Sequence, residues 1–153
     1  MTGLWAERRV PGSAGAGTVL IADDDGFSAE ALAEMLEDEG FSVVGVAIDG
    51  AQAVDAVRRL GPDVVVMDLR MPVMDGLEAT RLIREDSQPV QVVMLSAHDE
   101  IFLREEAVRS GAFRYLVKGC RPELLFDTIR DALAWRAHLE RGASFAPRAA
   151  ASA

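Results

Sequence analysis

Four short apolar runs in this chain each end at polar side chains that could do chemistry. The runs are residues 19–22, 64–67, 92–95 and 116–117, and the polar residues directly after them are Asp23, Asp24 and Asp25, then Asp68, Ser96 and Lys118. Short β-branched runs are typical of buried strands, and an open parallel sheet binds ligands outside the carboxyl ends of its strands. We therefore expect carboxylates, a hydroxyl and an ammonium group along one rim. That combination indicates a site for a metal ion and a transferable phosphoryl group.

The elements that would position these groups alternate regularly along the chain. Strands are predicted at residues 18–22, 42–46, 63–67, 91–95 and 113–117, and helices at 28–39, 51–60, 77–85, 100–110 and 122–141. Glycines stand where helices should stop, namely Gly40, Gly61, Gly111 and Gly142. Five strand–helix units predict an α/β fold with a doubly wound, five-stranded parallel sheet of the flavodoxin-like kind. The strand order 2-1-3-4-5 would bring the ends of the first and third strands side by side.

Length and composition predict one globular domain. Of the 153 residues, 50% are hydrophobic and 27% are charged, which is ordinary for a folded domain. Residues 18–141 are predicted to fold, between flexible tails at 1–17 and 142–153. The net charge of -9 argues against a nucleic-acid surface on this chain alone. Cys120 is the only cysteine, and no apolar stretch has the length of a signal peptide or a membrane span, so we expect a cytoplasmic protein without membrane contact.

The acidic residues after the first and third strands would repel one another. If these strands are neighbours, Asp23, Asp24 and Asp68 share a small volume, and two unit charges about 4 Å apart repel by roughly 4 kcal/mol at an effective dielectric constant of about 20. A cation would relieve this repulsion, and carboxylates completed by water and phosphate oxygens favour Mg²⁺ over zinc. The alternative is that Asp23, Asp24 and Asp25 only begin a solvated loop and cap the next helix.

The segment 68–76 predicts a tight loop that leaves one aspartate free. Pro72 and Gly76 favour a turn, and Asp75 is a candidate cap for the helix that follows. If Asp75 caps that helix, Asp68 is free to act as a nucleophile on a phosphoryl donor. An aspartate directly after a strand is otherwise most simply a helix cap itself.

Ser96 and Lys118 could assist such a nucleophile. The hydroxyl of Ser96 could donate a hydrogen bond to the phosphoryl group, and the ammonium group of Lys118 could pair with its charge. Taken singly, each has a structural alternative, because serine often caps a strand end and lysine is usually a solvated surface residue. Their joint placement with the acidic residues favours the site.

Several separated motifs together resemble a known family. The motifs are LIADD at 20–24, MDLRMPVMDG at 67–76, LSA at 95–97 and YLVK at 115–118. From Thr18 to about Arg141 the chain is similar to the receiver domains of bacterial two-component response regulators, which implies the CheY-like arrangement of five strand–helix units. The segment around Asp68 most resembles the subfamily that usually carries a C-terminal helix-turn-helix, and we expect none within residues 142–153, which are too few to form one.

The resemblance implies that Asp68 is the phosphoacceptor and part of a magnesium site. Asp68 would accept phosphate from a sensor histidine kinase or a phosphotransfer protein. Mg²⁺ would be held by Asp23, Asp24 and Asp68, with the backbone carbonyl of Arg70 as a further ligand. The chain would then be a signalling switch rather than a dedicated enzyme.

Three further residues take the positions at which the family reads the phosphoryl group. By this resemblance Ser96 would sense it, Lys118 would pair with it, and Tyr115 would be an aromatic switch whose ring moves inward. The alternative for Tyr115 is a half-buried strand residue. Family members commonly have proline after the lysine, often with a cis bond, whereas this chain has Gly119. Without proline a cis bond costs about 3 kcal/mol, so we expect a trans peptide.

The same resemblance implies where the signal leaves the domain. In the family the output surface combines the fourth helix, the fifth strand and the fifth helix, predicted here at 100–110, 113–117 and 122–141. A downstream protein partner or a homodimer would form through this face.

Three other functions use parts of the same pattern. A phosphatase of the haloacid-dehalogenase type also has an aspartate nucleophile and Mg²⁺, but it needs a second aspartate where this chain has Arg70. A flavodoxin-type cofactor binder would need hydroxyl and glycine donors after the first strand, where three acids would repel phosphate. The third is a receiver-like interaction scaffold that is never phosphorylated. Against it stands the complete set of Asp23, Asp24, Asp68, Ser96 and Lys118.

Overall fold

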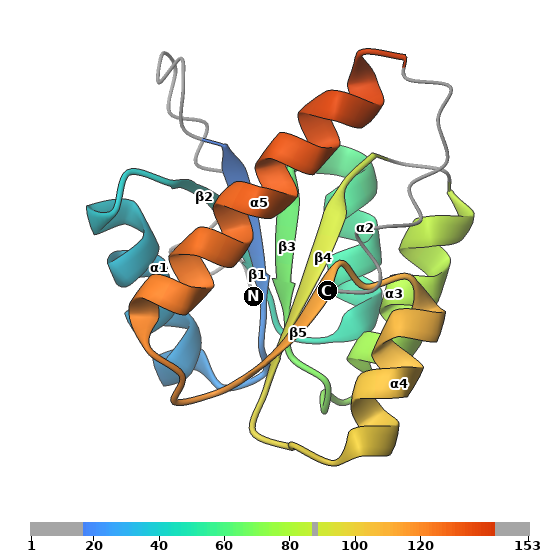
Figure 1. Ribbon diagram of the computed structural model, residues 1–153. Coiled ribbons are helices and arrows are strands. Elements are labelled where there is room, and N and C mark those ends of the chain that lie inside the picture. The colour runs from blue at the N-terminus through green and yellow to red at the C-terminus, as the bar shows by residue number, and fades with distance from the viewer. Residues whose placement is uncertain (1–16, 87–88, 143–153) are drawn as a thin grey trace.

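The computed structural model describes residues 17–86 and 89–142. Five strands form one parallel sheet in the order β2-β1-β3-β4-β5 (Figure 1). They are β1 (Thr18–Ala22), β2 (Ser42–Ala47), β3 (Val64–Met67), β4 (Gln91–Ser96) and β5 (Arg114–Val117). The predicted fold class and strand order are therefore confirmed.

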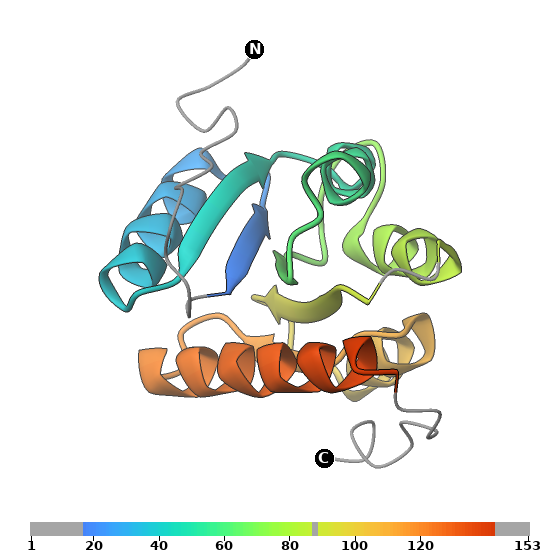
Figure 2. The same ribbon diagram turned by 90° about the horizontal axis from the view of Figure 1, so that it is seen from above.

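Helices cover both faces of the sheet. They are α1 (Gly26–Asp38), α2 (Gly50–Leu60), α3 (Gly76–Glu85), α4 (Ile101–Ser110) and α5 (Pro122–Glu140). Helices α1 and α5 lie on one face, and α2, α3 and α4 lie on the other (Figure 2).

Each face has its own hydrophobic core, and β1 contributes to both. Leu20 belongs to the core beneath α2, α3 and α4, whereas Ile21 belongs to the core beneath α1 and α5. Burying a side chain of this size stabilises the fold by roughly 1.5–3 kcal/mol. A slip of one residue in register would exchange the two faces, so this packing fixes the register and with it the positions of the residues that follow each strand.

The helix ends follow local capping chemistry. Helix α1 begins two residues earlier than predicted, because the Asp25 carboxylate accepts hydrogen bonds from the backbone N–H groups of Phe27 and Ser28, at 3.1 and 3.4 Å. The predicted stops at glycine are confirmed by positive φ angles of 56° at Gly61 and 99° at Gly111, the left-handed C-caps of α2 and α4.

The amino ends of β1 and β3 are linked by hydrogen bonds, at the opposite end of the sheet from the carboxyl ends that carry Asp23 and Asp68. The carboxylate of Asp63 accepts hydrogen bonds from the backbone N–H and the hydroxyl of Thr18, at 2.9 and 3.1 Å. The Asp63 N–H donates back to the Thr18 hydroxyl at 3.0 Å. Arg136 of α5 pairs with the other Asp63 oxygen at 3.0 Å, so one carboxylate links two strands and a helix.

The predicted tails lie outside the described residues except for Gly17 and Gly142, and their flexibility stays a prediction. Among the described helices, none combines the length and the apolar character that a bilayer crossing requires.

Candidate functional site

Adjacent strand ends bring Asp23 and Asp68 together. Ala22 of β1 pairs with Met67 of β3, and the next residue of each strand is the aspartate. The Asp68 N–H donates to the Ala22 carbonyl at 2.8 Å, and the Asp23 N–H donates to the Ala47 carbonyl at 2.9 Å. The sheet hydrogen bonding therefore continues for one residue past each strand, and it fixes the backbone positions of Asp23 and Asp68.

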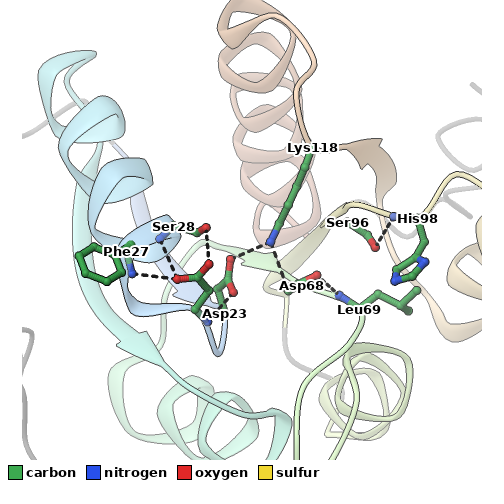
Figure 3. A network of polar contacts seen from close by, with 9 residues as sticks. Asp23, Phe27, Ser28, Asp68, Leu69, Ser96, His98 and Lys118 are labelled. Carbon is green, nitrogen blue, oxygen red and sulfur yellow. Dashed lines mark hydrogen bonds and ion pairs between the residues drawn. The ribbon is translucent and has the colours of Figure 1, made fainter.

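Lys118 links the two carboxylates. Its Nζ donates to Asp23 Oδ2 at 3.0 Å and to Asp68 Oδ2 at 3.1 Å (Figure 3). Lys118 follows β5, and its N–H donates to the Ser96 carbonyl at 2.8 Å, which anchors the backbone beside β4. The side chain then spans from β5 past the end of β4 to reach the acids after β3 and β1.

Partial burial shifts the pKa values of Asp68 and Lys118 in this cluster. The side chains of Asp23, Asp68 and Lys118 are 7%, 11% and 31% exposed, so these two carboxylates are largely removed from water and the lysine side chain is less so. Burial raises the pKa of Asp68, and the hydrogen bond and charge of Lys118 offset this only in part. Burial also lowers the pKa of Lys118, but its hydrogen bonds to Asp23 and Asp68 outweigh this and the net shift is upward.

The chemistry of the donor set fits a divalent cation. Asp23, Asp24 and Asp68 each offer a carboxylate oxygen, and these atoms lie within 4.8 Å of one another. Three ionised carboxylates and one ammonium group leave two negative charges, which match the charge of Mg²⁺. Oxygen ligands without sulfur or imidazole are those that Mg²⁺ prefers. Asp24 is exposed, so this side of the acidic cluster is open to solvent.

The third aspartate of the triplet has a different task. Asp25 caps α1, and its hydrogen bonds from the backbone and the hydroxyl of Ser28 lower the pKa of its carboxyl group. Its own N–H donates to Asp23 Oδ1 at 2.9 Å and holds that carboxylate in place. The helix-cap alternative for the triplet is therefore correct for Asp25, and Asp23 and Asp24 remain available as ligands. Asp75 also caps a helix as predicted, accepting from the Glu78 N–H at 2.9 Å.

Ser96 lies at the end of β4, the strand next to β3, and so on the side of Asp68 away from Asp23 (Figure 3). The residue is fully buried, and its Oγ accepts a hydrogen bond from the His98 N–H at 3.1 Å. The His98 carbonyl in turn accepts from the Tyr115 hydroxyl at 2.6 Å. Tyr115 is only 9% exposed, so it is more deeply buried than the half-buried strand residue of the alternative interpretation.

The loop after Lys118 departs from the family pattern as the sequence indicated. Within the described ranges every peptide bond is trans, including that between Lys118 and Gly119, which confirms the prediction. Gly119 has a φ angle of 92°, which glycine adopts freely and proline cannot. The role of the Arg70 carbonyl as a metal ligand stays a prediction.

Comparisons with known proteins agree with this geometry. The family model for the response regulator receiver domain matches residues 19–130. The chain is 39% identical over 115 residues to the DNA-binding response regulator MtrA of Mycolicibacterium paratuberculosis, covering 75% of this chain and 50% of that protein. It is 40% identical over 114 residues to the response regulator UvrY of Escherichia coli, covering 74% and 52%. The chain thus spans about half the length of the curated relatives it matches.

Solved structures show the same architecture. The signal receiver domain of a NarL-type regulator from Mycobacterium tuberculosis is 32% identical with a TM-score of 0.74, and the match covers 78% of this chain and 97% of that one. A CheX-CheY-BeF3-Mg²⁺ complex from Borrelia burgdorferi contains a chain that is 29% identical with a TM-score of 0.71, and here the match covers 75% and 87%. With the family model matching 19–130 and the carboxylates, serine and lysine at the carboxyl ends of neighbouring strands, the chain belongs to the response regulator receiver domain family.

Proposed function

We propose that this chain is a phosphorylation-dependent switch that accepts a phosphoryl group on Asp68 in the presence of Mg²⁺. The observation that carries the proposal is the contact of one ammonium group, that of Lys118, with the carboxylates of both Asp23 and Asp68. A receiver uses such a cluster to hold a cation and an acceptor side by side. The chain acts as a phosphoacceptor and not as a dedicated enzyme with a separate substrate.

In the transfer step a carboxylate oxygen of Asp68 attacks the phosphorus of a phosphohistidine. A P–O bond forms as the P–N bond breaks, and the electron pair returns to the imidazole nitrogen of the donor. When bound by Asp23, Asp24, Asp68 and the Arg70 carbonyl, Mg²⁺ would neutralise charge on the phosphoryl oxygens. The Mg²⁺ in the crystallised relative from Borrelia burgdorferi supports this choice of metal.

The phosphoryl group then changes what Lys118 and Ser96 contact. It adds roughly -1.5 to -2 charges beside an ammonium group that is bound to two carboxylates. Lys118 can turn one of its hydrogen bonds to a phosphoryl oxygen. Ser96, whose Oγ accepts the His98 N–H, can donate its hydroxyl hydrogen to a phosphoryl oxygen, and Tyr115 follows because its hydroxyl donates to the His98 carbonyl in the same β4–α4 loop.

The output surface is assigned to α4, β5 and α5. Three apolar side chains of α4 are exposed, Ile101 at 74%, Phe102 at 59% and Val108 at 48%. Apolar groups gathered on one helix support a protein contact there, with a downstream partner or a second copy of the chain.

The phosphodonor is a sensor histidine kinase or a phosphotransfer protein, and the chain works in the cytoplasm without contacting nucleic acid or membrane itself.

A second candidate is a receiver-like scaffold that is never phosphorylated. It would share the fold and the apolar surface of α4. The intact set of acids with Lys118 argues against it, because a scaffold gains nothing from largely buried, mutually repelling carboxylates.

The test is incubation of the full chain with Mg²⁺ and acetyl phosphate, followed by intact mass measurement. The wild type should gain one phosphoryl group, and Asp68→Asn should gain none. Asp55→Asn is a matched control, since Asp55 is paired with Arg59 on the surface of α2, and it should behave as the wild type. A folded wild type that gains no mass with Mg²⁺ present would favour the scaffold instead.

A further inference from the structure

The β4–α4 loop connects Ser96 to Tyr115 through a single residue. His98 donates its N–H to Ser96 Oγ and accepts the Tyr115 hydroxyl on its carbonyl, at 3.1 and 2.6 Å. The tyrosine ring belongs to the core cluster beneath α2, α3 and α4. Two kinds of contact orient this ring: the hydrogen bond from its hydroxyl to the His98 carbonyl, and the groups that pack against the face of the ring.

Arg104 of α4 provides a contact on that face. Its guanidinium carbon lies 5.3 Å from the centroid of the Tyr115 ring. A cation at this distance is attracted by the ring electrons, and guanidinium groups also stack on aromatic faces. If the ring turned outward, the Tyr115 hydroxyl would lose its carbonyl partner and the ring would lose this cation.

Asp99 holds Arg104 in this position. Nε of Arg104 donates to Asp99 Oδ1 at 2.9 Å, and a terminal nitrogen of the same guanidinium group contacts the same oxygen. Asp99 directly follows His98, so the loop residue that accepts the tyrosine hydroxyl is the neighbour of the residue that fixes the arginine. The contacts form a closed ring from the loop through Tyr115 and Arg104 back to the loop.

We propose that Arg104, fixed by Asp99, is a positioning residue that keeps Tyr115 in its buried orientation. This inference deepens the proposed function, because it rests on Tyr115 being the residue that reports phosphorylation of Asp68. The pair of Asp99 and Arg104, which we call the clamp, shifts the equilibrium of the Tyr115 ring toward its buried orientation before any phosphodonor acts. It thereby sets the fraction of molecules in which the ring is buried. A surface ion pair between Arg104 and Asp99 alone would contribute little, so the effect lies in the placement of the cation over the ring.

Tyr115 is the only tyrosine of the chain, which allows a direct test. The full chain labelled with 3-fluorotyrosine should give one folded ¹⁹F resonance, and the shift of that resonance between H₂O and D₂O reports exposure of the ring. In Arg104→Gln the ratio of buried to exposed ring should fall roughly two- to fivefold, the factor expected for loss of an exposed cation–π contact. Asp99→Asn should lower the same ratio. Arg104→Lys keeps the positive charge and should give a ratio between those of the wild type and Arg104→Gln.

Arg109→Gln is the matched control. Arg109 lies on the same helix and pairs with Glu105 and Glu106, so its loss makes the same charge change away from Tyr115. An unchanged H₂O/D₂O shift of the ¹⁹F resonance in Arg104→Gln, or an equal change of that shift in Arg109→Gln, would overturn the inference. The measurement uses no phosphodonor, so it separates failure of the clamp from failure of phosphorylation at Asp68. Acetyl phosphate added afterwards to both variants tests the second point independently.

Discussion

The α carbon of Gly76 lies so close to Asp68 that a Cβ placed on Gly76 would stand 2.1 Å from the Asp68 carbonyl oxygen. Gly76 is the first residue of α3, and its N–H donates to the Leu69 carbonyl at 2.8 Å. The loop that carries Asp68 is thus closed against the start of α3 with no room for a side chain at Gly76.

Gly76→Ala should therefore destabilise the domain by about 1–3 kcal/mol, because overpacking against backbone outweighs the gain from alanine in a helix. It should also slow phosphorylation by acetyl phosphate, since relief of the clash moves the Asp68 backbone. Urea unfolding and the rate of mass gain measure the two effects. Gly26→Ala is the control: this first residue of α1 has open space around it, so the change should be neutral or slightly stabilising. Equal stability of the two variants would contradict the prediction.

Asp68→Asn should stabilise the metal-free domain at neutral pH. Burial raises the pKa of Asp68, so the contribution of this group to stability is fully present below its unfolded pKa and is lost as pH rises through the folded pKa. The stability difference between variant and wild type should therefore grow across that range and then level off. Urea unfolding in EDTA, from about pH 3 to about pH 8, covers the titration.

Asp86 provides a control of opposite sign for this experiment. Its hydrogen bond from Arg58 lowers its pKa, so its stabilising contribution is present above the unfolded pKa and is lost as pH falls through the folded pKa. Asp86→Asn should be less stable than the wild type at neutral pH and equal to it in acid. The same pH trend in both variants would rule out the electrostatic explanation.

Mg²⁺ should raise the unfolding temperature of the wild type, and EDTA should reverse the effect. A ligand at about 100 times its dissociation constant stabilises the folded state by about 2.7 kcal/mol. Asp23→Asn should lose most of this response, because it removes a carboxylate of the cation site. Asp25→Asn should keep it, since asparagine still caps α1 and the side chain of Asp25 faces the helix. Calorimetric titration with Mg²⁺ gives the affinities, and a full response in Asp23→Asn would refute the assigned ligands.

Val73→Gly should stabilise the domain by about 0.5–1 kcal/mol, because a side chain in left-handed backbone costs about 1–2 kcal/mol and glycine does not. Val73 has a φ angle of 70° and is 85% exposed, so little packing is lost. The same substitution at Val108, in the middle of α4, should destabilise instead. Thermal unfolding distinguishes the two, and a lower melting temperature for Val73→Gly would show that the valine makes contacts that outweigh its backbone strain.

The fold and the meeting of the acids were predictable because they follow from long-range order that the sequence pattern encodes. Short β-branched runs such as 64–67 favour buried strands, and their alternation with helices favours a parallel sheet. The carboxyl ends then coincide, and Asp23 and Asp68 must be neighbours. This step needed only the order of apolar and polar residues along the chain and no knowledge of side-chain contacts.

Local assignments within the site were harder. The three acids after β1 have the same chemistry, and only the backbone path shows that Asp25 caps α1 while Asp23 faces Lys118. The pair of Asp99 and Arg104 was missed because the two residues are five apart, which is not a helical spacing, and Asp99 precedes the helix. Asp63 was predicted to lie inside β3 but precedes it, since its side chain bonds to Thr18.

The bond between Thr18 and Asp63 has a consequence at the far end of the sheet. Both acid-bearing strands are pinned where they begin and hydrogen-bonded along their whole length, so neither can slide past its neighbour. The gap between the two carboxylates is thus set by the paired strands and not by the exposed loops around it. Under the proposed function, substitutions in those loops that change which phosphodonor docks would leave this gap, and with it the affinity for Mg²⁺, unaltered.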